Sequence, residues 1–308
     1  MLKKILQHDL LVKKPPVVID LGASGESYKA WNQIYPFSIF LALDGDKRKK
    51  TSYKNKFKKY ISINKIVDVK KRKKKFFLTK SPFCSSILKP STKKTEEWFF
   101  HNQFKILKQL NIKTITLNQI LKENKIEYID FLKIDLQGID LDIFKNITPK
   151  IKKRIKFVDI EPSLYGFYEG ENNNTPETLK YMQKEFDVED IKFGKHVKGN
   201  IKNINNLTNI KKKLIYFINK KSISYLNISF LKKFKKDNFN ERDLLIYLYI
   251  LLLTKRYAEV FSILKKINSK DIIFTEIKKY CELKIKLSFF KYIFYLPFIL
   301  IKNIIRQF

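Results

Sequence analysis

The sequence predicts an α/β fold with helices on both faces of a parallel sheet, followed by a helical C-terminal extension. Strand-like and helix-like segments alternate from Val17 to about Asn219, which is the order typical of such sheets. Short apolar runs such as Val17–Ile19 indicate strands buried on both faces. After Ser222 glycine is absent and the segments look helical. We therefore expect a first domain over residues 1–220 and a helical extension over residues 221–308.

Proline residues and capping residues delimit several of these elements. Pro15 and Pro16 block a helix from running into the first strand. Thr175 is expected to cap a helix that has Pro176 at its first position. In chain order the expected strands cover residues 17–19, 37–43, 60–63, 76–79, 128–134, 155–160, 188–193 and 214–218. The expected helices cover residues 26–35, part of 92–110, 116–124, 139–144 and 175–186, then a two-helix hairpin over 243–253 and 256–267.

Carboxylates follow the ends of four expected strands, namely Asp20, Asp44, Asp135 and Glu161. Open α/β sheets bind ligands at the carboxyl edge of their strands, so these side chains predict a single site. The glycines of the Gly22–Gly25 turn allow backbone amides to approach a ligand closely. Asp44 follows that turn by about 20 residues, where Rossmann-like sites place an acid for ribose hydroxyls. The plainer interpretation of Asp44 is a turn residue at a strand end.

Composition limits the classes of partner. The chain has 308 residues, and 64 basic and 30 acidic side chains give a net charge of +34. Such a charge ordinarily indicates nucleic acid or an anionic membrane. However, only six of the basic residues are Arg, alanine occurs four times, and Lys, Ile and Asn are abundant. This composition is also what AT-rich codons produce, and phosphate and base readers favour the bidentate Arg. Nucleic-acid binding is therefore not the favoured prediction.

The sequence favours a cytoplasmic protein. The only two cysteines, Cys84 and Cys281, lie far apart and fit a reducing compartment. The segment Met1–Leu11 is too polar for a signal peptide. No apolar run reaches the roughly 20 residues of a membrane span.

The C-terminal segment has two possible interpretations. Basic residues gather near one face of the expected helix, and aromatic and aliphatic residues cover the rest, which suits a helix lying in a membrane surface. Pro297 should kink such a helix. The plainer alternative is a terminal helix that packs on the preceding hairpin or on a second subunit.

Four stretches resemble the methyltransferases of the FkbM type. The segment Ile129–Asp140 is similar to the central motif of that family. Val18–Gly25 resembles its first cofactor loop, Ser81–Ser86 its Pro-x-Cys-Ser-Ser loop, and Glu161–Gly170 its glutamate-to-tyrosine stretch. The resemblance covers roughly residues 17–219 and implies a Rossmann-like methyltransferase sheet that uses S-adenosylmethionine.

The resemblance also implies roles for particular residues. The methionine half of the cofactor would lie against Asp20, Gly22, Ala23, Ser24 and Gly25. Asp44 would accept hydrogen bonds from the ribose hydroxyls, and we assign Asp46 and Ser85 to the same cofactor site.

Methyl transfer to a hydroxyl needs alignment and gains from a general base. Asp135 is the first candidate for that base, Glu161 is the second, and Gln137 is expected to position the substrate. Two strand-end carboxylates could instead bind a divalent metal. Lys133 is interpreted as structural and Cys84 as a packed thiol. Tyr165 and Tyr168 either line an acceptor pocket or belong to the core.

Together with the strand-end carboxylates, the resemblance implies an S-adenosylmethionine-dependent methyltransferase. The acceptor class rests on the resemblance alone, which implies a hydroxyl on a sugar or glycan or on a small metabolite. The alternative is a basic, non-catalytic module with a relic of the same fold that docks on a membrane or a polyanion. Cofactor binding separates the two.

Overall fold

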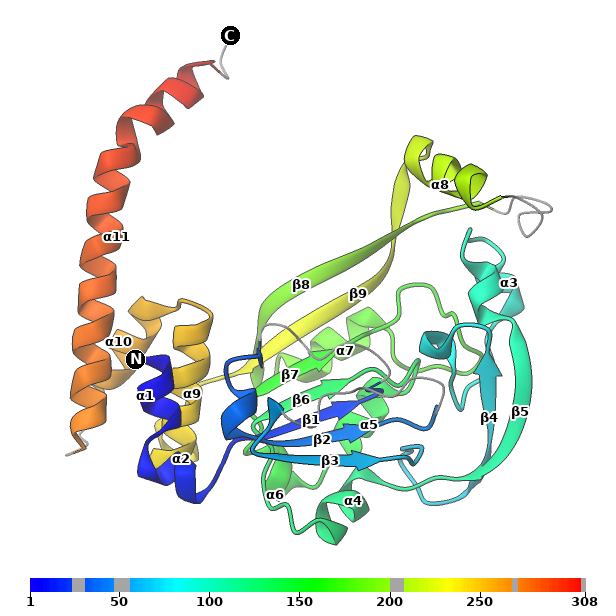
Figure 1. Cartoon of the computed structure of the whole chain (residues 1–308), viewed down its shortest axis with the longest axis horizontal. Coiled ribbons are helices and arrows are strands. Elements are labelled where there is room, and N and C mark those ends of the chain that lie inside the picture. Colours follow the sequence, from blue (N-terminus) through cyan, green and yellow to red (C-terminus); the bar gives the residue numbers. More distant parts are fainter. Residues whose placement is uncertain (24–30, 47–55, 200–207, 268–270, 306–308) are drawn as a thin grey trace. The chain divides into compact units, whose positions relative to one another are not determined.

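The computed structural model describes residues 1–23, 31–46, 56–199, 208–267 and 271–305. The chain divides into two compact units (Figure 1). One unit comprises Pro15–Asn238, and the other combines Met1–Lys14 with Phe239–Phe308. Ser24, Gly25 and most of the helix expected over residues 26–35 lie outside the described residues.

The larger unit is built on a seven-stranded sheet with the order β3-β2-β1-β6-β7-β9-β8 (Figure 1). Its strands are β1 (Val17–Leu21), β2 (Ile39–Leu43), β3 (Lys59–Ile63), β6 (Phe131–Ile134), β7 (Phe157–Ile160), β8 (Phe186–Val197) and β9 (Lys221–Lys232). The first five strands of that order are parallel, whereas β9 is antiparallel to both of its neighbours. The predicted α/β fold with a mostly parallel, Rossmann-like sheet is confirmed.

Both faces of the parallel strands are covered, which explains their unbroken apolar runs. Alternate side chains of β1, from Val17 to Leu21, pack in one core with three helices. These helices are α4 (Leu117–Glu123), α5 (Asp140–Asn146) and α7 (Thr175–Met182). On the opposite face Trp31 packs against Phe131 and Phe157, at ring-centroid distances of 5.3 and 5.8 Å.

The strand register places a row of polar side chains across that second face. Asp20 of β1 pairs with Lys133 of β6, which pairs with Asp159 of β7, which pairs with Ser229 of β9. Residues paired in register lie on the same face of a sheet. The row therefore brings ionisable groups together beneath the carboxyl edge of the sheet.

A separate two-stranded sheet consists of β4 (Lys73–Thr79) and β5 (Ile106–Lys113). The sequence predicted β4, but it placed part of β5 in a helical region. The remaining short elements of this unit are η2 (Tyr35–Phe37), η4 (Pro82–Cys84), α3 (Thr92–Thr95), η5 (His101–Phe104), α6 (Pro149–Lys152), α8 (Asn209–Ile218) and η7 (Lys236–Asn238). Between β4 and β5, an aromatic cluster forms around the buried Trp98.

The antiparallel strands β8 and β9 extend beyond the sheet as a two-stranded arm. β9 pairs with β7 only from Ile228 to Leu231, whereas its preceding residues pair with β8 alone. Helix α8 lies between β8 and β9 in the chain, at the outer end of the arm (Figure 1).

Three sequence predictions are wrong in this region and around α7. Residues 214–218, predicted as a strand, belong to helix α8, because a short apolar run does not distinguish the two structures. The segment after Ser222, predicted as helical, is strand β9, so the sheet continues past residue 220. Finally, the cap of α7 is Asn174 rather than Thr175, since Asn174 Oδ1 accepts from the Glu177 amide at 2.9 Å.

The smaller unit is helical throughout its described residues. It contains α1 (Leu2–Leu6), α2 (Asp9–Lys13), α9 (Glu241–Leu253), α10 (Tyr257–Lys265) and α11 (Ile272–Ile305). Helix α9 is apolar on all sides and almost entirely buried, which makes it the centre of this unit. The first part of α11 buries Ile277 and Cys281, whereas the side chains from Phe289 to Leu296 that the structure describes are exposed. Within the described residues, no helix is long and apolar enough to cross a membrane.

Candidate active site

Gly22 brings the ends of three strands into contact. Its amide donates to the Leu43 carbonyl at 2.9 Å, which ties the end of β1 to the end of β2. Its φ of +86° is in the left-handed region, and a Cβ on this residue would lie only 1.9 Å from the Asp135 carbonyl oxygen. Only glycine fits both restrictions. The turn after β1 is thereby packed directly on the residue that follows β6.

Asp44, at the end of β2, has one carboxylate oxygen without a partner. Its Oδ1 accepts from the Asp46 amide at 2.7 Å, whereas its Oδ2 is buried and makes no hydrogen bond to the residues that the structure describes. Burial, assisted by the charges of nearby carboxylates, raises the pKa of Asp44 to about 6, although the hydrogen bond from the Asp46 amide lowers it. A buried acceptor in this state favours a ligand that donates hydrogen bonds.

Ser85 reaches the same place from the loop after β4. Its hydroxyl donates to Asp46 Oδ2 at 3.3 Å, so the loop and the end of β2 are joined. The structure therefore brings together Asp44, Asp46 and Ser85, which the sequence assigned to one site. Ala23 is buried directly after Gly22, as a residue of the same turn.

Lys133, which the sequence analysis interpreted as structural, forms ion pairs with two of the candidate site residues. Its ammonium lies 3.3 Å from Asp20 Oδ1 and 3.4 Å from Asp135 Oδ2. Burial lowers the pKa of Lys133, but the negative charges of Asp20 and Asp135 outweigh burial and raise it above its ordinary value. The sequence spacing is consistent with the contact between Lys133 and Asp135, because residues two apart face the same side of a strand.

Asp20 is held below the site rather than in its wall. Its side chain is buried against Lys133, and burial raises its pKa although the lysine lowers it. Asp20 does not line the pocket described below. Its observed contact is with Lys133, which in turn contacts Asp135.

Gln137 occupies a strained turn after β6. Its φ is +58°, which is unusual for a residue with a side chain. Its Nε2 donates to Asp135 Oδ1 at 2.6 Å, and its Oε1 lies 2.8 Å from the Tyr168 hydroxyl. The Ser86 hydroxyl donates to the Gln137 carbonyl at 2.8 Å. Two contacts therefore orient the Gln137 side chain, and a third holds its backbone carbonyl.

Glu161 joins the site from the end of β7. Asn173 connects it to the β6 turn, since Asn173 Nδ2 donates to the Glu161 carbonyl at 2.9 Å and to Asp140 Oδ2 at 3.1 Å. Asp140 Oδ1 in turn accepts from the Leu136 amide at 2.7 Å. Burial raises the pKa of the Glu161 carboxyl well above its usual range, and the charges of Asp135 and Asp140 add to this effect.

Two pockets meet at Gln137. The first encloses about 550 Å³ of empty space, and its lining includes Gly22, Asp44, Asp46, Ser85, Asp135 and Gln137. The second encloses about 350 Å³, and its lining includes Gln137, Glu161, Tyr168, Glu171, Ser224 and Tyr225. The predicted cofactor and catalytic residues are thus distributed over two neighbouring hollows with one shared side chain.

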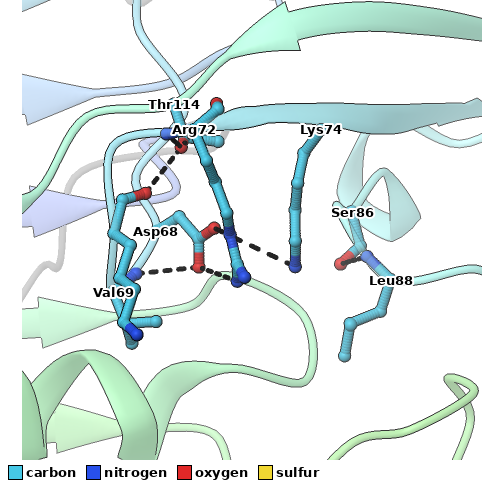
Figure 2. Close-up of polar contacts among 8 residues, drawn as sticks. Asp68, Val69, Arg72, Lys74, Ser86, Leu88 and Thr114 are labelled. Atoms are coloured by element: carbon cyan, nitrogen blue, oxygen red, sulfur yellow. Dashed lines mark hydrogen bonds and ion pairs between the residues drawn. The ribbon is translucent and has the colours of Figure 1, made fainter.

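The segment that lines one side of the first pocket is followed by a cluster of ion pairs around Asp68. Residues 65–67 line the pocket, and the buried Asp68 follows them. Asp68 Oδ2 lies 2.8 Å from Arg72 Nε and 3.9 Å from the Lys74 ammonium (Figure 2). The Arg72 amide also donates to the Thr114 hydroxyl at 3.0 Å, which fastens this segment to β5. The wall is therefore fixed by the root of the β4-β5 hairpin.

The remaining candidates from the sequence are a cysteine, two tyrosines and a possible metal site. Burial raises the pKa of the Cys84 thiol to about 12, which does not favour a thiolate nucleophile. Tyr165 packs on Trp98 at 5.1 Å, whereas Tyr168 both joins that cluster and lines the second pocket. Among the described side chains no group of three or more His, Cys, Asp or Glu is arranged to hold a metal ion.

Comparison with known proteins identifies a domain that contains part of this site. The family model described as "Methyltransferase FkbM domain" matches residues 51–188. Searches of curated proteins and of solved structures found no match to the chain. The matched residues include Ser85, Asp135 and Glu161, whereas Gly22 and Asp44 precede them. The family implies dependence on S-adenosylmethionine. The chain therefore contains a methyltransferase FkbM domain.

Proposed function

We propose that the protein transfers a methyl group from S-adenosylmethionine to a hydroxyl of a sugar, a glycan or a small metabolite. The observation that carries this proposal is the meeting of two pockets at Gln137. One pocket has the groups that suit the cofactor, and the other has the groups that suit an acceptor. A transferase needs both partners side by side.

The first pocket fits the cofactor in its donor and acceptor chemistry. The unpartnered Oδ2 of Asp44 suits a ribose hydroxyl, which would supply the missing hydrogen bond. The absent Cβ of Gly22 leaves its turn close to Asp135. Asp46 and Ser85 add polar groups to the same wall. When bound, S-adenosylmethionine supplies a methyl group that is already activated by its sulfonium charge.

The second pocket supports an acceptor with hydroxyl groups. Glu161 and Glu171 offer carboxylates, Ser224 offers a hydroxyl, and Tyr168 and Tyr225 add aromatic surface. Aromatic faces combined with acceptor groups suit a sugar ring, which has apolar faces and a polar edge.

We propose Glu161 as the general base, and Asp135 and Gln137 as positioning groups. Asp135 lies 3.4 Å from the Lys133 ammonium and accepts a hydrogen bond from Gln137 Nε2, so its carboxylate is already held by two partners. The pKa of Glu161 is raised, so its carboxylate accepts a proton more readily once ionised. Glu161 also lines the acceptor pocket. Gln137 contacts Asp135 and Tyr168 and lies between the two hollows.

Calorimetry and a transfer assay test the proposal. The purified chain should bind S-adenosylmethionine but not NAD, and Asp44→Ala should weaken that binding. Transfer of a labelled methyl group should then be measured with a hexose, its amino sugar and a hexose that lacks one hydroxyl. Labelling of the amine rather than a hydroxyl would contradict O-methylation. Absence of any cofactor binding would favour the basic, non-catalytic module instead.

A further inference from the structure

Helix α8 lies at the outer end of the β8-β9 arm (Figure 1). It exposes a row of large apolar side chains. Ile210, Leu214, Phe217 and Ile218 are 72, 55, 87 and 73% exposed. Their spacing of i, i+4, i+7 and i+8 places them on one face of the helix. Ile215 and Tyr216 pack instead against Phe99 and Val197 of the domain. The exposed apolar face is thus held outward by contacts on the opposite side.

Lysines border this apolar face on both sides. At about 100° per residue, Lys213 falls on one edge of the row and Lys211 on the other. Between Thr208 and Ile223 the sequence has five lysines and no acidic residue. Long basic side chains at the edges of an apolar helix face can reach lipid headgroups while that face enters the membrane interface.

We propose that the α8 face docks on the surface of an anionic phospholipid bilayer. Charge complementarity favours this partner, because the bordering lysines would meet anionic headgroups. It disfavours a second copy of the chain, because a symmetric contact would bring the same lysines together. The apolar centre of the face disfavours nucleic acid, which is bound through charged and stacking groups along a groove. The inference does not depend on the proposed methyl transfer.

The β8-β9 arm connects the proposed docking helix to the second pocket. Ser224 and Tyr225 line the second pocket from β9, and they are the sixth and seventh residues after the end of α8. A bilayer bound at α8 would therefore lie close to the pocket proposed for the acceptor.

Vesicle binding by the full chain tests the proposal. Phosphatidylcholine vesicles with added phosphatidylglycerol should retain the protein at low salt, and pure phosphatidylcholine vesicles should retain much less. The Phe217→Glu variant should bind the anionic vesicles about tenfold more weakly or worse, since it places a charge in the apolar face. Phe217 makes little contact with the fold, so its thermal unfolding should match that of the original chain.

The matched control is Phe290→Glu, which alters an exposed aromatic side chain of α11. It should leave vesicle binding within about twofold if α8 is the docking surface. Equal binding by the Phe217→Glu variant, or loss of binding only in the Phe290→Glu variant, would overturn the assignment to α8. Failure of the original chain to bind anionic vesicles would overturn it as well, as would a self-association that Phe217→Glu abolishes.

A spectroscopic variant locates the helix in the bilayer. Both native tryptophans, Trp31 and Trp98, are buried, so a Phe217→Trp variant has one exposed reporter. Its emission should shift to shorter wavelength with anionic vesicles and should be quenched by brominated acyl chains. An unchanged spectrum in a vesicle-bound sample would show that another surface makes the contact.

Discussion

The two halves of the seven-stranded sheet differ in packing and in what they contribute. The parallel strands β3, β2, β1, β6 and β7 are four or five residues long, and their carboxyl edge forms the first pocket. The antiparallel strands β8 and β9 are each 12 residues long, and much of β8 is exposed. The parallel half holds the groups proposed for the cofactor, whereas the arm contributes to the acceptor pocket and carries α8. We infer that the parallel half binds the cofactor, and that the antiparallel half selects the acceptor and the surface on which the protein docks.

The largest loss of cofactor binding and stability should come from disturbing the contact between the turn after β1 and the residue after β6. Gly22→Ala would place a methyl group 1.9 Å from the Asp135 carbonyl at a φ of +86°. We expect loss of cofactor binding and a destabilisation of at least about 1–3 kcal/mol from backbone strain alone. Calorimetry and thermal unfolding measure the two effects.

Gly170→Ala is the matched control for that variant. Gly170 also has a positive φ of +71°, but an added Cβ would meet nothing within 4 Å. The two variants therefore share the strain and differ in the clash. If both lower cofactor affinity equally, the contact of Gly22 with Asp135 is not part of the site.

The second prediction distinguishes the two carboxylates that could serve as the base. Glu161→Gln should lower kcat by about 10²–10⁴-fold while the affinity for the cofactor stays similar. Because burial raises the pKa of Glu161, the rate of the original enzyme should rise with pH through that pKa, and the variant should lose this rise. A pH–rate profile at saturating cofactor provides the measurement.

Asp135→Asn completes that comparison. It removes the charge that pairs with Lys133 but retains a group that can bond Gln137. We expect a slower reaction with the pH dependence still present, because Glu161 remains. If Asp135→Asn abolishes the pH dependence and Glu161→Gln does not, the base is Asp135.

The contrast between the halves also explains what the sequence could predict. Buried parallel strands produce apolar runs that end in polar residues, so β1, β2, β6 and β7 and the carboxylates after them were recognisable. Lys133 was interpreted as structural, but its partners Asp20 and Asp135 were not foreseen, because they come from strand register and alternation rather than from a motif. Within the arm, the predicted strand over residues 188–193 lies in β8, but α8 and β9 were misassigned. Helix α8 shows its apolar face to solvent and the outer part of β9 is half-exposed, so no buried pattern indicates either element.

The third prediction concerns Asp44 and has a smaller effect. Asp44→Asn should weaken S-adenosylmethionine binding by about tenfold to a hundredfold, the value of a charged hydrogen bond. The raised pKa of about 6 means that the stability contributed by Asp44 is present at low pH and is lost as pH rises through about 4 to 6. Cofactor affinity should depend on pH in the opposite direction, because the ionised carboxylate of Asp44 is the better hydrogen-bond acceptor.

Cofactor affinity of the original chain should therefore fall as pH is lowered through about 6, the pKa of Asp44. The Asp44→Asn variant should show a flatter profile, since it has no carboxyl at this position. Calorimetry at several pH values measures both. A profile that is equally steep in the variant would assign the pH dependence to another group, such as Glu161.

The smallest effect should come from the arm. Tyr225 lines the second pocket from β9, and it is 39% exposed and contributes nothing to the first pocket. Tyr225→Leu should raise the KM for a sugar acceptor several-fold, because it removes an aromatic surface worth about 0.5–1.5 kcal/mol, and it should leave cofactor affinity unchanged. Lys108, on strand β5 of the separate hairpin, lines neither pocket, so Lys108→Ala serves as the surface control. A change in cofactor affinity with Tyr225→Leu would mean that the two halves of the sheet are not separate in function, because the arm would then act on the pocket formed by the parallel strands.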